Sequence, residues 1–127
     1  MEIPLDMLNK IEAQSRLETP EEACGAIVGG SGFDLELIPM NNDHENPCFY
    51  YRFDPQAWVL ICHILDDQGK RPLVIYHSHP HGDSYPSISD IAGSIEGMLY
   101  LIYSPKGFSL WEIKDKQYVI EEPIVIA

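Results

Sequence analysis

The segment from Tyr76 to Asp90 constrains the fold more than any other part of this 127-residue chain. His77 and His79 are separated by one residue. Because side chains alternate between the two faces of a strand, both imidazoles would point the same way. The apolar run 73–76 before them predicts a β-strand that delivers His77. Pro80 then interrupts the hydrogen-bond ladder, and a polar loop follows.

A short helix is expected directly after this loop. Ser87 is a good N-cap residue, and Asp90 stands three positions later, as in a capping box. The end of the strand and the start of the helix would then bring two histidines and one aspartate together. A catalytic zinc site typically takes three protein ligands and keeps one open position. We therefore take His77, His79 and Asp90 as candidate ligands of one Zn²⁺ ion.

A zinc site of this kind also needs groups that handle protons and charge. Bound zinc would lower the pKa of a water molecule and polarise a carbonyl. A general base would take the proton and pass it to the leaving amine. Glu22 is the candidate base, since it precedes a strand that could run beside the central one, and Ser87 is the candidate oxyanion donor. The simpler interpretations are a surface carboxylate at Glu22 and a plain helix cap at Ser87.

The hydrophobic pattern of the chain alternates between helical and strand periods. It predicts helices over residues 4–17, 55–67 and 87–95. Strands are expected over 23–30, 34–40, 48–53, 73–77, 98–104, 108–113, 117–120 and 124–126. This order predicts one α/β domain over residues 1–127, with a mixed β-sheet flanked by helices. Because helix 55–67 is apolar over most of its surface, we expect it to be largely buried against the sheet.

The aromatic segment 48–53 has two interpretations. As a strand it is expected in the core, the safer of the two. Alternatively, Phe49–Tyr51 could line a channel for an extended substrate tail by strand addition. His81 is expected to be an exposed residue of the polar loop and not a metal ligand.

Charge and cysteine usage narrow the partners and the compartment. Twenty acidic and eight basic side chains give a net charge of -12, and the basic residues are scattered, so nucleic-acid binding is disfavoured. No apolar run approaches the length of a membrane span, and the start of the chain lacks a signal-peptide pattern. The three cysteines show no CxxC spacing, so a cytoplasmic protein is expected. The oligomeric state is left open, and a homodimer is compatible with the sequence.

Two parts of the chain resemble one known family. The segments His77–Pro80 and Ser87–Asp90, with six residues between them, resemble the JAMM motif of the MPN+ (JAB domain) metalloproteases. The segment Glu22–Gly25, followed by Gly29, resembles the glutamate strand of that family. All five functional positions are present at the expected spacing, and the resemblance covers essentially the whole chain.

This resemblance implies a fold, an activity and a set of roles. The fold would be a twisted mixed sheet between helices, similar to that of the cytidine deaminases. The activity would be zinc-dependent hydrolysis of a peptide or isopeptide bond after the C-terminus of a ubiquitin-like or sulfur-carrier protein. His77, His79 and Asp90 would hold the zinc, Glu22 would act as the base, and Ser87 would stabilise the oxyanion. The chain looks most similar to small prokaryotic members, some of which release an amino acid from a carrier protein.

Two other functions stay open at this point. One is a non-catalytic MPN-type interaction module, which would not need an intact metal site. The other is a JAB peptidase in phage or cell-wall biology. The chain keeps all five motif residues, which favours an enzyme over the module.

Overall fold

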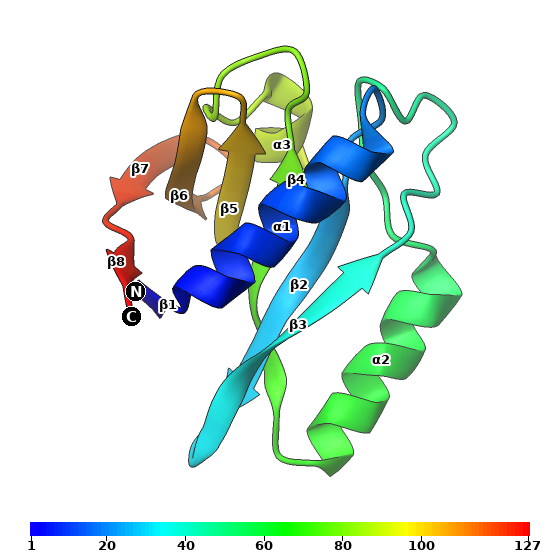
Figure 1. The fold of residues 1–127 in the computed structure, drawn as a ribbon. Coiled ribbons are helices and arrows are strands. Elements are labelled where there is room, and N and C mark those ends of the chain that lie inside the picture. The colour runs from blue at the N-terminus through cyan, green and yellow to red at the C-terminus, as the bar shows by residue number, and fades with distance from the viewer.

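Six strands form one twisted mixed sheet at the centre of the computed structural model, which describes residues 1–127 (Figure 1). In spatial order they are β3 (Phe33–Met40), β2 (Cys24–Gly30), β4 (Arg71–Ser78), β5 (Leu99–Ser104), β6 (Gly107–Lys114) and β7 (Tyr118–Glu122). Only β4 and β5 pair in parallel, and the other neighbours are antiparallel. The expected mixed α/β class is confirmed.

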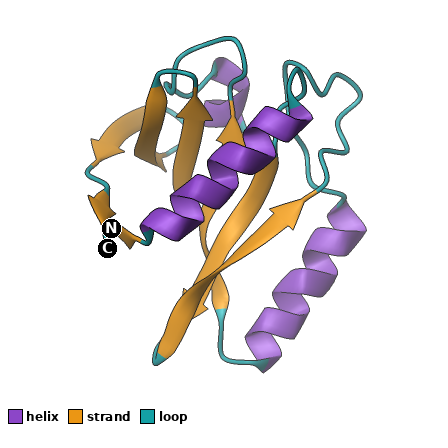
Figure 2. Ribbon diagram, viewed as in Figure 1, coloured by secondary structure: helices purple, strands orange, loops and turns teal.

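The two faces of the sheet are covered by different helices (Figure 2). The long helix α1 (Leu5–Glu18) crosses one face, where its residues Met7, Leu8 and Ile11 pack on the strands. Two further helices, α2 (Pro55–Asp67) and α3 (Ile88–Ala92), contribute Trp58 and Ile91 to the apolar clusters of the other face. Successive side chains of β4 point to opposite faces of the sheet, so Val74 and Tyr76 pack in the cluster under α1 while Ile75 packs in the cluster on the other face.

The termini are joined by a small second sheet that the sequence pattern only half predicts. Strand β1 (Glu2–Ile3) pairs in parallel with β8 (Val125–Ile126). The last strand was expected, but two residues at the start of a chain carry too little pattern to indicate a strand. Ile3 is fully buried in the cluster under α1, so this pairing closes the core at that end.

Strand β4 lies between β2 and β5 and is buried from Val74 to Ser78. Its antiparallel register with β2 places Cys24 opposite His77. The start of β2 therefore lies beside the end of β4, which is the arrangement that a role for Glu22 at the site requires. The extended backbone continues one residue past β4, because the amide of His79 donates to the carbonyl of Tyr103 at 2.8 Å.

Three expectations about this face were wrong. Residues 48–53 form no strand, because the segment folds into a loop whose backbone groups bond to Asn42, Asp43 and Asn46. Helix α3 ends at Ala92, and its C-cap is Gly93. Only Leu65 of α2 is buried, while Val59 and Leu60 are 68% and 60% exposed. That helix contacts the sheet along a single stripe, so the rest of its apolar surface has no neighbour.

No helix of the structure is long and apolar enough to cross a membrane.

Glycine at position 25 is required by close packing inside the sheet. A Cβ atom built there would lie 2.3 Å from the hydroxyl of Tyr76, which itself bonds to Gln14. Overpacking of this kind costs about 1–3 kcal/mol of folding stability. We therefore expect Gly25→Ala to lower the midpoint of urea unfolding. Gly82→Ala is the control, because its Cβ would meet only an ordinary contact of 3.9 Å. Equal midpoints in the two variants would contradict the assigned packing.

Candidate metal centre

The three predicted ligands meet at the end of β4. The Nε2 atoms of His77 and His79 lie 3.0 Å apart. Asp90, in the first turn of α3, places Oδ2 at 3.0 Å from His77 Nε2 and 3.1 Å from His79 Nε2. His77 is fully buried and the other two are largely enclosed, so the three atoms form a compact triangle shielded from water.

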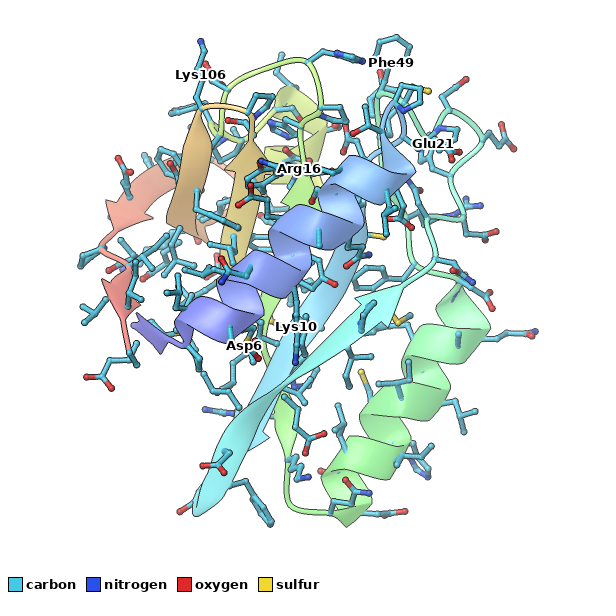
Figure 3. The ribbon with its side chains drawn as sticks, in the orientation of Figure 1. Asp6, Lys10, Arg16, Glu21, Phe49 and Lys106 are labelled. Carbon is cyan, nitrogen blue, oxygen red and sulfur yellow. The ribbon has the colours of Figure 1, made fainter.

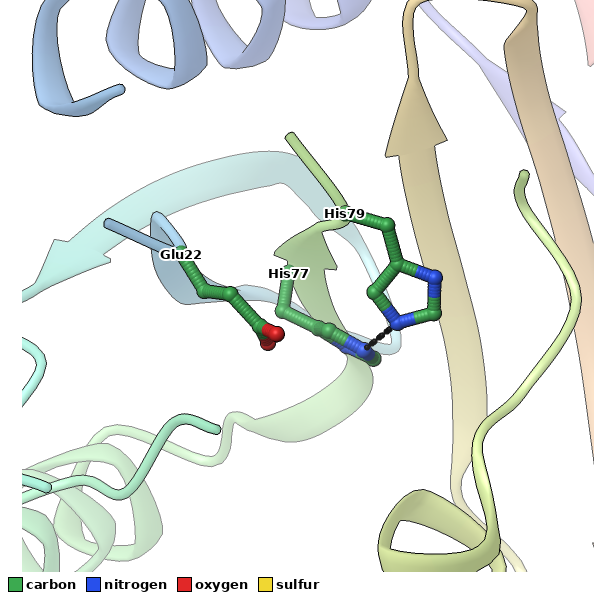
Figure 4. A group of neighbouring side chains, drawn as sticks. All are labelled: Glu22, His77 and His79. Atoms are coloured by element: carbon green, nitrogen blue, oxygen red, sulfur yellow. Dashed lines mark hydrogen bonds between the residues drawn. The ribbon is translucent and has the colours of Figure 1, made fainter. Parts of the chain in front are cut away.

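Glu22 reaches the same place from the start of β2. Its carboxylate and the two imidazoles present ligand atoms that all lie within 4.8 Å of one another. Figure 4 shows the three side chains converging, with the Glu22 carboxylate directed at the ring of His77. Glu22 is only 6% exposed, so the interpretation of this residue as a surface carboxylate is wrong. Glu22 and Asp90 are thus both within reach of the histidines, and Asp90 makes the closer contacts with them.

The donor set fits a cation. His79 Nδ1 lies 2.8 Å from the carbonyl oxygen of Asp83, which can only accept a hydrogen bond, so Nδ1 carries the proton. In the neutral form of the ring, which is the form that binds a metal, the Nε2 lone pair would face Asp90 Oδ2 and His77. These electron-rich atoms would repel one another at 3.0–3.1 Å unless a proton or a metal ion lies between them. Imidazole nitrogen and carboxylate oxygen are ordinary zinc ligands.

Two buried atoms beside the candidate ligands lack partners, and the one on Glu22 bears on proton transfer at the site. Glu22 Oε1 and His77 Nδ1 have no hydrogen-bond partner, although buried polar atoms normally have one. An unpartnered carboxylate oxygen beside three converging donor atoms is free to accept a proton from something held at the site. The structure therefore contains a group of side chains suited to a metal and a carboxylate beside them that is not otherwise used.

Burial and neighbouring charges separate the pKa values of these groups. Burial raises the pKa of Glu22 to about 7, although the nearby His79 opposes this. Burial lowers the pKa of His77 and outweighs the hydrogen bond to Asp90. Burial would raise the pKa of Asp90, but hydrogen bonds from His77 and His79 hold it well below its usual range. Asp90 is therefore ionised and His77 neutral, which are the states that bind metals. Burial alone would lower the pKa of His79, but its hydrogen bonds to Asp90 and to the carbonyl of Asp83 raise it, so a metal ion has to compete with a proton for this ring.

Ser87 is the N-cap of α3, as the sequence predicts. Its Oγ accepts from the amide of Asp90 at 3.1 Å, and its own amide donates to Asp90 Oδ2 at 2.9 Å. The hydroxyl also lies 3.0 Å from Ser89 Oγ and is exposed at the edge of the site. The capping box thus fixes the carboxylate of Asp90 in place. His81 is exposed in the loop, as expected.

A cavity of about 410 Å³ opens beside Asp90, next to the aromatic segment for which a channel wall was the alternative to a core strand. Its wall includes Tyr50, Tyr51, Phe53 and Trp58. The ring of Tyr51 stacks on His77 with centroids 4.3 Å apart and planes 22° apart. The aromatic run in the sequence was the available signal, but its strand-like composition favoured a core strand.

Three curated relatives are similar to this chain over most of its length. A family model described as prokaryotic homologues of the JAB domain matches residues 4–115. The CysO-cysteine peptidase of Mycobacterium tuberculosis is 33% identical and covers 96% of this chain and 88% of its own. The probable TtuB-protein conjugate cleaving protease of Thermus thermophilus is 31% identical, with 92% and 78% covered. The desampylase of Haloferax volcanii is 35% identical, with 71% and 67% covered.

Two solved structures share the fold. The solution structure of a protein from Desulfitobacterium hafniense matches with a TM-score of 0.82 at 26% identity, over 99% of this chain and 92% of that chain. A JAB1/MPN domain protein from Archaeoglobus fulgidus matches with a TM-score of 0.62 at 20% identity, over 98% and 99%. The likeness in fold therefore extends over essentially the whole chain.

Removal of one ligand should abolish tight metal binding. We expect the purified protein to bind one zinc ion per chain, and His77→Ala to bind at least about tenfold more weakly, because a three-ligand site loses a third of its donors. Competition with a chromogenic chelator measures this affinity. His63→Ala is the control, since His63 is an exposed residue of α2. Equal affinity in His77→Ala and the unmodified protein would rule out this ligand set.

Proposed function

The chain belongs to the family of prokaryotic homologues of the JAB domain, and we propose that it is a zinc-dependent peptidase of ubiquitin-like or sulfur-carrier proteins. The bond hydrolysed would lie after the C-terminal residue of the carrier, and the released group would be an amino acid or a conjugated protein. The observation that carries this proposal is the convergence of His77, His79 and Asp90 with the buried carboxylate of Glu22.

In this proposal His77, His79 and Asp90 hold the zinc. When bound, the metal would supply Lewis acidity towards the substrate carbonyl and make a water molecule more acidic. Glu22 then acts as the general base. Its buried Oε1 has no other partner and its pKa is about 7, so it can take up a proton and deliver it to the leaving amine near neutral pH.

We assign oxyanion stabilisation to Ser87. Its Oγ accepts from the amide of Asp90, so the hydroxyl proton is left for a second partner. Ser89 Oγ or a substrate oxygen can take that role. The exposed position of Ser87 beside a proposed ligand supports the assignment, because an oxyanion donor must be accessible to substrate. The helix cap uses a lone pair of Ser87 Oγ, whereas oxyanion stabilisation would use the hydroxyl proton.

The aromatic cavity gives a substrate segment room beside the metal ligands. Since residues 48–53 are a loop, strand addition has no strand to extend there. The side chains of Tyr50 and Tyr51 line the cavity instead, while Phe49 is 74% exposed and lies at the outer edge of the molecule (Figure 3). A wall of aromatic rings suits an extended peptide better than a highly charged ligand.

The two other functions have less support. A non-catalytic module has no use for a buried carboxylate left unpaired next to three metal-binding groups. The similar relatives are named for a peptidase, a conjugate-cleaving protease and a desampylase, which supports carrier processing over a phage or cell-wall role. The three free cysteines support a cytoplasmic location, because reducing compartments keep thiols unpaired.

We also propose a homodimer formed through α2. Its exposed residues Val59, Leu60 and Ile64 form an apolar surface on a helix segment, residues 55–65, with no Asp, Glu, Lys or Arg. Two copies of a protein with a net charge of -12 repel each other over most of their surfaces. An uncharged apolar face is where such copies can approach at least electrostatic cost.

Replacement of the base should separate chemistry from metal binding. We expect Glu22→Gln to keep its zinc and lose about 10²- to 10⁴-fold in kcat, since the amide cannot take up the proton. The substrate is a ubiquitin-like carrier protein with one amino acid added after its C-terminal Gly-Gly, and mass spectrometry measures the release. Glu21→Gln is the matched control, because Glu21 is the exposed neighbour. Full activity in Glu22→Gln would show that another group is the base.

Light scattering during size-exclusion chromatography tests the dimer. The protein should elute with the mass of two chains, and Leu60→Glu should elute as a monomer because a buried charge is costly at an apolar contact. Leu17→Glu makes the same change at an 86% exposed position on α1 and should leave the dimer intact. A monomeric mass for the unmodified protein at about 100 µM, where a dimer with a Kd of about 1 µM would be largely assembled, would disprove the homodimer.

A further inference from the structure

One asparagine side chain connects the proposed base to the loop that walls the cavity. Asn42 Nδ2 donates to the backbone carbonyl of Glu22 at 3.0 Å and to that of Tyr50 at 2.9 Å. It also lies 3.3 Å from the carbonyl of Pro47. That carbonyl in turn accepts from the amide of Glu22 at 2.7 Å. Both backbone polar groups of Glu22 are therefore held by the loop.

The amide oxygen of the same side chain joins the two ends of the loop that runs from Asn42 to Arg52. Asn42 Oδ1 accepts from the amides of His44 at 3.1 Å and Arg52 at 3.2 Å. The amide of Asp43 adds a bond of 2.8 Å to the carbonyl of Arg52. The backbone segments at the start and the end of the loop are thus joined through one carboxamide. Only Asn or Gln offers a donor and an acceptor in this form, and Gln is one methylene longer.

The loop closed in this way carries two contacts to the site. Tyr51 stacks on the buried ring of His77, and Tyr50 and Tyr51 form part of the cavity wall beside Asp90. If the hydrogen bonds of Asn42 were lost, the aromatic wall and the backbone of Glu22 would no longer be held by a common residue. A single side chain therefore holds the backbone of the proposed base and the aromatic cavity wall in a defined position relative to each other.

We propose that Asn42 is a positioning residue for the reaction, which acts by holding the backbone of Glu22 and the cavity wall together. This inference rests on the proposed function. Asn42 does not touch the metal-binding atoms, and its effect passes through Glu22 and Tyr51. Misplacement of a catalytic group by about 1 Å can reduce the rate by about 10²-fold. A residue that controls the position of Glu22 should thus affect turnover more than fold stability.

The substitution Asn42→Asp separates the two ends of the side chain. It keeps the acceptor for His44 and Arg52 but replaces the donor that holds Glu22 with a carboxylate oxygen. Asn41→Asp is the matched control, because it makes the same chemical change and adds the same charge at the exposed neighbouring residue, for which the structure shows no side-chain hydrogen bond. Asn42→Ala is the second variant, since it removes both ends without adding a charge.

The test combines four measurements on the zinc-loaded protein. We expect Asn42→Asp and Asn42→Ala to bind zinc as the unmodified protein does and to lose about 10- to 100-fold in kcat. Amide exchange, followed by NMR, should become at least about tenfold faster at Glu22, whose N–H bonds to the loop. Asn41→Asp should match the unmodified protein in zinc content, kcat, thermal midpoint and exchange.

Two outcomes would separate this inference from the proposed function. If the unmodified protein releases the amino acid and both Asn42 variants keep full kcat, even at a lower thermal midpoint, Asn42 has only a structural role and the inference is wrong. If the unmodified protein hydrolyses no carrier substrate, the proposed function is wrong. The amide exchange at Glu22 then still shows whether Asn42 holds that backbone, because this measurement needs no turnover. Unchanged exchange in both variants would overturn the inference by itself.

Discussion

The antiparallel pairing of β2 with β4 is the interaction on which the rest of the site depends. It places Cys24 opposite His77, so the residue two positions before Cys24 lies beside the end of the central strand. Two more bonds secure this junction. The amide of Ala23 donates to Ser78 Oγ at 2.8 Å, and the amide of Ser78 donates to the carbonyl of Ala23 at 3.0 Å. A register shift of one residue would turn the glutamate or the histidines to the opposite face of the sheet.

Asp90 links the local stability of α3 to the chemistry of the site. One oxygen of its carboxylate accepts the Ser87 amide of the capping box and faces both imidazoles. The same geometry that starts a five-residue helix therefore fixes a proposed ligand. A short helix has little stability of its own, so the cap and the metal-binding group support each other. The MPN-like fold, confirmed by the structural likeness, provides the strand end and the helix start that meet here.

The loop between β3 and α2 illustrates how local propensity can mislead. Residues 48–53 are rich in aromatic side chains, which favour strands, yet the backbone groups are taken by Asn42 and the turn. Side-chain hydrogen bonds of this kind compete with a strand ladder. Helix α2 was misjudged for a related reason. Its apolar composition was correctly seen, but composition does not show whether a neighbour exists to cover each face.

The sequence by itself determined the elements and the local part of the site. The spacing of His77 and His79 places both on one face of a strand end, and Ser87 and Asp90 define a capped helix start, because these relations act over a few residues. Only the tertiary structure decided that Glu22 meets them across 55 residues of chain, that a loop walls an aromatic cavity, and that α2 is exposed. Such contacts depend on strand register and on which surfaces meet, and neither is encoded in short-range periodicity.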